Sequence, residues 1–260
     1  SSFAVMGRSK ASRNLKVLAR DVKRYQAKKH GESISVILLH GFGGTPDNMS
    51  QVWGQALHHL LPSSHVRVKC PAAPVRSVSC YAGVEVPAWY DYFTDRRTAG
   101  EETVDHRHVE ETRQRLLGVV EKEVARVGAD RVFLLGVSQG GCTALDVAVH
   151  CRHALGGVVC SRGHAMSVTL AAGRPCATPV LAFHGEADDQ IPCWLTQQSL
   201  GQLRDLGSDV QLVTEPELGH TEPSIQELLL VGRFFRRRVA RSSSPRAGGG
   251  ESGRPGAAGQ

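Results

Sequence analysis

Long apolar runs, paired cysteines and clustered metal ligands are all missing from this 260-residue sequence. No stretch approaches the roughly 18–20 consecutive apolar residues of a membrane span, and the first residues lack the apolar core of a signal peptide. The seven cysteines are odd in number and none is spaced as Cys-x-x-Cys, which argues against a disulfide framework, a zinc site or a redox motif. The sequence therefore predicts reduced structural thiols, no metal and a cytoplasmic location.

Acidic residues are nearly absent from both ends of the chain. Residues 8–29 and 236–260 together hold almost half of the 31 lysines and arginines but two of the 25 acids, so the middle is acidic despite the net charge of +6. This distribution argues against a basic catalytic domain for nucleic acid. The basic ends are candidates for peripheral contact with an anionic membrane, although a solvated helix face and a disordered tail are the commoner structures.

Composition divides the chain into three parts. Residues 1–30 form a basic extension whose few apolar residues recur at helical spacing. Residues 31–240 are long enough for one α/β catalytic domain with a substantial core. Residues 241–260 are rich in Ser, Gly, Pro and Arg, a composition typical of disorder.

Apolar runs of strand length alternate with amphipathic helical stretches in residues 31–240. This alternation predicts a mostly parallel sheet with helices on both faces. The expected strands are residues 33–39, 66–70, 132–137, 156–160, 178–183 and 209–213, and the expected helices are 49–61, 103–127, 142–150, 195–206 and 222–239. In the last helix, the residues expected to face inward are Ile225, Leu228, Leu229, Gly232 and Phe235. Residues 77–100 read as an irregular aromatic-bearing loop, either a pocket wall or a local lid.

The strongest motif is Gly136-Val-Ser-Gln-Gly-Gly141, which lies between a predicted strand and a predicted helix. This context favours a nucleophile elbow over a plain turn. The elbow holds Ser138 in strained backbone geometry, and glycine at 136 and 140 leaves room where strand and helix pass closely. The helix start points N–H groups and a positive dipole end at the reaction site.

A glycine-rich loop, His40-Gly-Phe-Gly-Gly-Thr45, follows the first predicted strand. Such a loop lets backbone N–H groups approach a ligand closely. In an α/β-hydrolase it supplies one oxyanion-hole donor, and the residue after the serine supplies the other. We therefore predict the amides of Phe42 and Gln139 as donors, with an ordinary strand-to-helix loop as the alternative. We expect His40 to orient this loop rather than to act as a base.

A serine nucleophile needs a base, and α/β-hydrolases place it last in the order serine, acid, histidine. His220 is the one histidine that follows the segment 184–189. The acid must hold the imidazole in the correct tautomer. Asp188, just past a predicted strand, is our first choice, followed by Asp189 and then Glu186. Strand ends in a parallel sheet share one edge, so these distant residues can meet.

These residues imply acyl transfer without a metal or organic cofactor. His220 takes the proton of Ser138, which attacks a carbonyl carbon, and the amides of Phe42 and Gln139 bind the oxyanion. Water activated by the same histidine then clears the acyl-enzyme.

Several segments together resemble the acyl-protein thioesterases and the related lysophospholipase-like carboxylesterases, over about residues 33–240. The most specific are the Ser-Gln-Gly-Gly elbow, the Pro-x-x-Pro-x-Arg segment at 71–76 and Trp-Tyr-Asp at 89–91. The other segments are residues 36–45, 183–192 and 219–220. The resemblance implies an α/β-hydrolase fold, compact and without a large cap domain, with Ser138, Asp188 and His220 as catalytic residues.

The resemblance also implies a substrate class. We expect hydrolysis of long-chain acyl groups on S-acylated (palmitoylated) proteins. The nearest alternative is a carboxylesterase or lysophospholipase acting on small or lipid acyl esters, and the remote one is a binding protein without turnover. We expect Gly43, Trp89, His164 and Ile191 to line the substrate pocket, and the partners to be S-acylated proteins or acyl-ester lipids but not nucleic acid.

Overall fold

The computed structural model describes residues 33–61, 66–94, 103–221 and 223–242. The predicted basic extension, residues 1–30, lies outside the described residues, as does the predicted tail from residue 243 onward. The last helix runs to Ser242, two residues into the segment predicted as tail. None of the helices within the described ranges combines the length and apolarity that a bilayer span requires.

The described residues contain a six-stranded sheet in the order β2-β1-β5-β6-β7-β8. Every neighbouring pair in this sheet is parallel. The strands are β1 (Ile34–Leu39), β2 (Val66–Lys69), β5 (Val132–Val137), β6 (Gly157–Ser161), β7 (Val180–Gly185) and β8 (Val210–Glu215). All six were expected from the sequence, and their carboxyl ends lie along one edge of the sheet.

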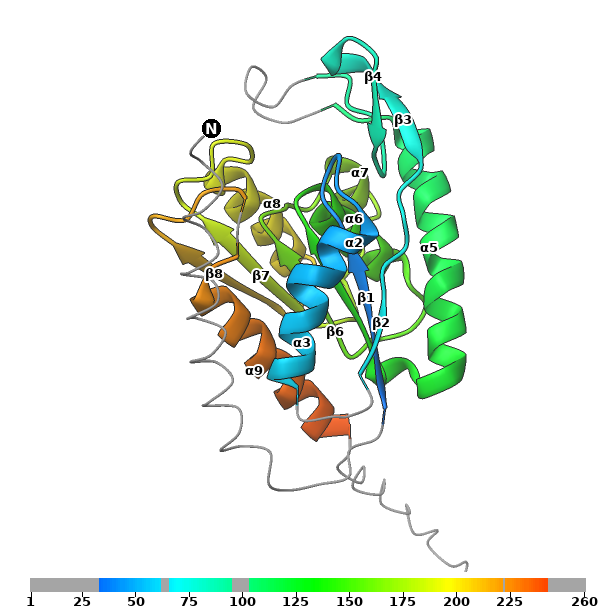
Figure 1. The fold of residues 1–260 in the computed structure, drawn as a ribbon, viewed down its shortest axis with the longest axis vertical. Coiled ribbons are helices and arrows are strands. Elements are labelled where there is room, and N and C mark those ends of the chain that lie inside the picture. The colour runs from blue at the N-terminus through cyan, green and yellow to red at the C-terminus, as the bar shows by residue number, and fades with distance from the viewer. Residues whose placement is uncertain (1–32, 62–65, 95–102, 222, 243–260) are drawn as a thin grey trace, which may run out of the picture.

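Helices cover both faces of the sheet, as predicted (Figure 1). The longer ones are α5 (His106–Val127), α6 (Gln139–His150), α8 (Cys193–Asp205) and α9 (Ile225–Ser242), and the shorter ones are α2 (Pro46–Met49), α3 (Gln55–Leu60) and α7 (Ser167–Leu170). A π-helical segment, Ser50–Gly54, joins α2 to α3. In β1, Ile37 and Leu39 belong to the core beneath α5 and α6, whereas Val36 and Leu38 belong to the core beneath α3 and α9.

The inward face of helix α9 is partly the one predicted. Gly232 and Phe235 are buried and Leu228 packs against the core, as expected. Ile225 and Leu229 are instead 40% and 37% exposed, whereas Glu227 and Val231 are fully buried. The apolar pattern did not indicate that a carboxylate occupies the first inward position. That carboxylate, Glu227, is paired with a buried arginine, as described below.

The segment expected to be irregular contains a β-hairpin. Strands β3 (Val75–Val78) and β4 (Val84–Pro87) pair antiparallel, and in Figure 1 they project beyond one end of the central sheet. The connecting turn uses positive φ angles at Ala82 and Gly83. Alanine rarely adopts this conformation, so the sequence carried no strong turn signal, and both strands are four residues long.

Candidate active site

Ser138 sits on a strained turn between β5 and α6. Its backbone has φ 55° and ψ −123°, a region that non-glycine residues rarely occupy. A Cβ built on Gly136 would lie 1.9 Å from the carbonyl oxygen of Gly140, and one built on Gly140 would lie 2.2 Å from that of Leu39. The predicted requirement for glycine at 136 and 140 is therefore confirmed, since the obstructing atoms are backbone.

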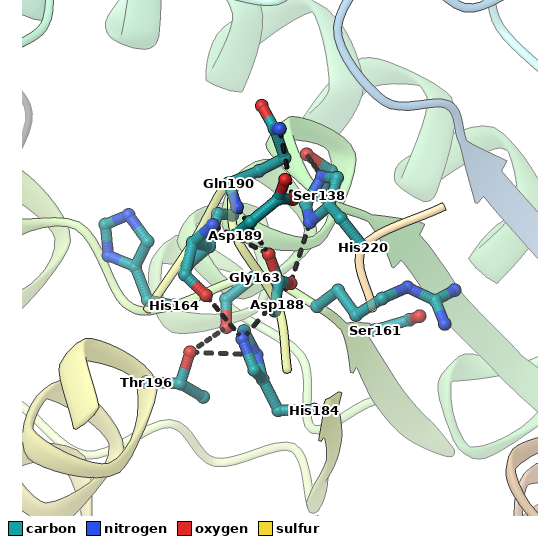
Figure 2. A network of polar contacts seen from close by, with 12 residues as sticks. Ser138, Ser161, Gly163, His164, His184, Asp188, Asp189, Gln190, Thr196 and His220 are labelled. Atoms are coloured by element: carbon teal, nitrogen blue, oxygen red, sulfur yellow. Dashed lines mark hydrogen bonds and ion pairs between the residues drawn. The ribbon is translucent and has the colours of Figure 1, made fainter. Parts of the chain in front are cut away.

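Three side chains from three loops meet at the carboxyl edge of the sheet (Figure 2). The His220 Nε2 lies 2.9 Å from the Ser138 Oγ, and the His220 Nδ1 lies 2.7 Å from Oδ2 of Asp188. The other carboxylate oxygen, Oδ1, accepts the N–H groups of Gln190 and Ile191 at 2.9 and 2.8 Å. Because the Asp188 carboxylate accepts a hydrogen bond from Nδ1–H, the lone pair of Nε2 is free to accept the serine proton.

The Asp188 carboxyl is held ionised by its surroundings. Burial raises its pKa, but hydrogen bonds from His184, His220 and the Ile191 amide outweigh burial and hold the pKa well below its usual range. A carboxylate therefore faces the His220 imidazole throughout the neutral pH range, and can stabilise the imidazolium that forms when the serine proton moves.

The two other carboxylates weighed from the sequence point elsewhere. Asp189 accepts a hydrogen bond from the side-chain amide of Gln190 at 3.1 Å, and Glu186 accepts one from the Thr214 hydroxyl at 2.7 Å. Both are exposed. The structure brings Asp188, and neither of these neighbours, against His220.

The glycine-rich loop after β1 lies against Ser138. A Cβ built on Gly41 would lie 3.4 Å from the Cβ of Ser138. Within the described ranges, the Phe42 N–H has no acceptor, whereas the next two amides of the loop donate to backbone carbonyls. The Gln139 N–H opens α6, where helical amides lack intrahelical acceptors. Two unengaged amides thus lie on segments adjoining the serine, as expected of oxyanion donors.

His40 is locked in one neutral tautomer. Its Nε2 accepts the Ala73 N–H at 3.1 Å, so the ring proton sits on Nδ1, which lies 2.8 Å from the Gly41 carbonyl oxygen. Burial lowers the pKa of His40, although the hydrogen bond to Gly41 opposes this. The prediction that His40 orients the loop is confirmed by these contacts.

Trp89 joins the loop to the elbow. Its indole N–H donates to the carbonyl oxygen of His40 at 2.7 Å, and its backbone N–H donates to the side-chain oxygen of Gln139 at 2.9 Å. The side-chain nitrogen of Gln139 donates to the Tyr90 carbonyl at 2.8 Å. The buried side chain of Gln139 therefore holds residues 89 and 90, and its backbone amide remains the predicted oxyanion donor. The sequence did not indicate the role of the side chain.

The four residues predicted to line the substrate pocket differ in exposure: Trp89, His164 and Ile191 are buried, whereas Gly43 is exposed. Their role in binding substrate stays a prediction. A cavity of about 170 Å³ lies between α7 and α8. Its lining residues are Ala165, Ser167, Leu170, Leu195, Gln198, Ser199 and Gln202.

Two further groups near the site were missed. Arg162 and Glu227 form a fully buried ion pair, with Nη1 of the arginine 2.8 Å from Oε2 of the glutamate. It anchors the start of α9, directly after the loop that carries His220. The second group is His184, at the end of β7, whose ring lies beneath Asp188 (Figure 2). Its position in an apolar run gave no sign of a polar contact.

Across the residues described, no group of three or more His, Cys, Asp or Glu side chains is arranged to hold a metal ion.

A serine on a strained strand-to-helix turn, with a histidine and an aspartate from later loops of a parallel sheet, defines an α/β-hydrolase. A family model described as Phospholipase/Carboxylesterase matches residues 21–235. The chain therefore belongs to that family, and it is a serine hydrolase.

Individual relatives agree with this assignment. The chain is 33% identical over 195 residues to a probable carboxylesterase of Oryza sativa subsp. japonica, covering 72% of this chain and 80% of the relative. It is 28% identical over 222 residues to acyl-protein thioesterase 1 of Gibberella zeae, covering 79% and 90%. The crystal structure of Arabidopsis thaliana SOBER1 superposes with a TM-score of 0.71 at 25% identity, covering 80% of this chain and 99% of that one.

Proposed function

We propose that this protein removes long-chain acyl groups from S-acylated proteins, with Ser138 as nucleophile, His220 as general base and acid, and Asp188 as the orienting carboxylate. One observation carries the proposal: two hydrogen bonds of 2.9 and 2.7 Å run from the Ser138 hydroxyl through His220 to Asp188. The substrate class is supported by the similarity to proteins named acyl-protein thioesterase.

Acylation begins when the Ser138 oxygen attacks the thioester carbonyl carbon and its proton passes to Nε2 of His220. The carbonyl oxygen becomes an oxyanion, which the amides of Phe42 and Gln139 stabilise. The carbon–sulfur bond then breaks, and the thiol of the protein substrate leaves with the proton held by His220. Asp188 stays ionised throughout and stabilises the transient imidazolium.

In deacylation water takes the place of Ser138 as nucleophile, and Ser138 becomes the leaving group. His220 takes a proton from water, the resulting hydroxide attacks the acyl-serine ester, and the same two amides bind the second oxyanion. Collapse returns the proton to Ser138 and releases the fatty acid. Each proton transfer passes through Nε2 of His220, which explains why a single base suffices for both halves.

A second candidate is a carboxylesterase or lysophospholipase that acts on small or lipid acyl esters. The 33% identity to a probable carboxylesterase favours it. Both candidates share the same nucleophile, and they differ in the acyl chain and leaving group accepted. We further propose a cytoplasmic location, with the basic ends of the chain, residues 8–29 and 236–260, as a peripheral contact with anionic membrane.

Two measurements test the proposal in sequence. A fluorophosphonate probe should label the wild type and the control Ser50→Ala, which changes an exposed serine, but not Ser138→Ala. An unlabelled wild type would remove the catalytic assignment. Hydrolysis of palmitoyl and acetyl thioesters and oxyesters should then show the highest kcat/KM for the palmitoyl thioester. Turnover restricted to two-to-four-carbon oxyesters would instead establish the second candidate.

A further inference from the structure

Asp188 is contacted by two imidazoles at a single oxygen atom. Its Oδ2 lies 2.7 Å from Nδ1 of His220 and 3.3 Å from Nε2 of His184. His220 is partly exposed, whereas His184 is fully buried. Figure 2 shows His184 on the opposite side of the carboxylate from His220 and Ser138. The mechanism proposed above makes no use of His184.

The proton on Nε2 of His184 can be located from its neighbours. This nitrogen lies 2.8 Å from the Ile191 carbonyl oxygen and 3.3 Å from Oδ2 of Asp188. Both atoms accept hydrogen bonds and donate none. Nε2 therefore carries a hydrogen, and that hydrogen is shared between a carbonyl and the carboxylate.

Thr196 holds the other edge of the ring. Its hydroxyl lies 3.0 Å from Nδ1 of His184 and 2.9 Å from the carbonyl oxygen of Gly163. The hydroxyl donates to the Gly163 carbonyl oxygen, and its contact with Nδ1 holds that edge of the ring in place. The hydrogen on Nε2 is located from its own two acceptors, so it does not depend on this contact.

We propose that His184 is a positioning residue: it donates to the Asp188 oxygen that also accepts from His220, and so fixes the carboxylate and limits how strongly that oxygen binds His220. The inference rests on the function proposed above. The backbone amides of Gln190 and Ile191 hold Oδ1, and the two imidazoles hold Oδ2. Together these four donors fill the acceptor capacity of the carboxylate.

Because two imidazoles share one Asp188 oxygen, the direction in which removing His184 would shift the pH profile can be predicted. An oxygen that accepts hydrogen bonds from two donors stabilises each donor less than it would stabilise one alone. Without His184, Oδ2 would serve His220 only, and the protonated form of His220 would gain stability. The base would then lose its proton at higher pH, so the acid limb of kcat/KM would move upward. The other titratable side chains near this carboxylate are Glu186, Asp189, Cys193 and His164, and such a variant retains all four.

Two substitutions at this position form a matched pair. In His184→Gln the amide nitrogen can replace Nε2 and donate to Ile191 and Asp188, whereas in His184→Asn the shorter side chain can replace Nδ1 alone. We expect His184→Asn to lower kcat about tenfold and to move the acid limb up by about half a pH unit. His184→Gln should restore both toward wild type. Both variants lack a titratable ring, so their difference isolates the donor.

A control separates positioning from stability. Thr178→Val removes one buried hydrogen bond, to the Leu155 amide, at the opposite end of β7. It should lower the thermal midpoint without moving the acid limb. If His184→Asn likewise lowers only the midpoint, or if the Asn and Gln variants behave alike, the positioning role is refuted.

A measurement without turnover separates this inference from the proposed function. In ¹⁵N-edited NMR spectra, the hydrogen-bonded Nδ1–H of His220 should move to lower field in His184→Asn than in wild type or His184→Gln. An unchanged resonance would overturn the inference even in an active enzyme. If Ser138→Ala retained activity, the proposed function would fail while this resonance still tested the shared carboxylate.

Discussion

The two sides of Ser138 are held by different kinds of contact. On the β1 side, His40 and Trp89 bond to backbone atoms, and both ring nitrogens of His40 are engaged in one neutral tautomer. On the β7–β8 side, Asp188 and His220 bond to each other's side chains. The first side therefore presents fixed dipoles, and the second contains His220, which gains and loses a proton beside a permanently ionised carboxylate.

This difference follows from what each side must do in acyl transfer. Oxyanion donors work best when they need no reorganisation as charge develops. A general base must change its protonation state within the working pH range. Substitutions on the β1 side should therefore lower the rate equally at every pH, whereas those on the β7–β8 side should change the shape of the pH profile.

The largest effect is expected where the proton moves. Asp188→Asn should lower kcat/KM about 10⁴-fold, because an amide in place of the carboxylate favours the wrong tautomer of His220 and cannot stabilise its charged form. Asp189→Asn, in an exposed neighbour that faces away, serves as the control and should retain activity. Steady-state kinetics on a palmitoyl thioester measures both, and equal losses in the two variants would reject the assignment of the acid.

The same substitution should change stability at low pH. The folded-state pKa of Asp188 lies below its usual value, so its carboxylate contributes stability that is present above the unfolded pKa and is lost as the pH falls through the folded one. Urea unfolding across this acid range should show a flatter decline for Asp188→Asn than for wild type. An identical decline would mean that the carboxylate is not stabilised by its contacts.

The next effect tests the close packing at the elbow. Gly140→Ala should cost about 3 kcal/mol or more of unfolding free energy, because the new Cβ would lie 2.2 Å from a backbone oxygen. Gly118→Ala in α5, where no atom lies within 4 Å of the new Cβ, should instead stabilise by about 1 kcal/mol. Urea unfolding distinguishes the two, and a tolerated Gly140→Ala would contradict the described backbone.

A smaller effect is expected from the indole that supports the β1 loop. Trp89→Phe leaves the buried His40 carbonyl without its donor, a loss of about 1–3 kcal/mol. We expect kcat to fall about tenfold because the loop amides lose their fixed position. The pH profile should keep its shape, in contrast to His184→Asn. A shifted acid limb in Trp89→Phe would erase the distinction between the two sides.

The smallest effect concerns His40 and stability. Burial lowers the pKa of His40 below the ordinary 6.5, so the unfolded chain binds a proton there before the folded protein does. Stability attributable to this residue therefore falls as the pH drops from about 6.5 toward the folded-state pKa. His40→Gln, whose side-chain oxygen can accept the Ala73 N–H, should flatten this part of the profile. An unchanged slope in urea unfolding between pH 7 and 5 would show that His40 is not held neutral.

How far the sequence predicted each region depends on the kind of contact. The elbow was predictable because local backbone crowding requires glycine at 136 and 140. The chain order serine, acid, histidine then narrowed the candidates for acid and base to Asp188 and His220. These signals lie in short segments, and each follows a run of apolar residues. The Phe42 amide was likewise indicated by its place after a central strand.

Contacts between distant segments were not predictable. Nothing next to His184 in the chain indicates that its ring meets Thr196, twelve residues away, or that Glu227 pairs with Arg162, 65 residues away. The contacts of Trp89 were unpredictable for the same reason, since its indole N–H bonds to a carbonyl oxygen supplied by another loop. Such contacts depend on how side chains from distant segments are oriented toward one another in the folded protein. The periodicity of apolar residues does not indicate these pairings.

The most direct test of the account is a trapped acyl-enzyme. Wild-type protein mixed with a palmitoyl thioester, quenched within the first turnover and digested, should show a palmitoyl mass increment on the peptide that contains Ser138. His220→Ala should show none on the same timescale. A palmitoyl group found instead on a cysteine peptide, or turnover without any adduct on the Ser138 peptide, would contradict the central claim.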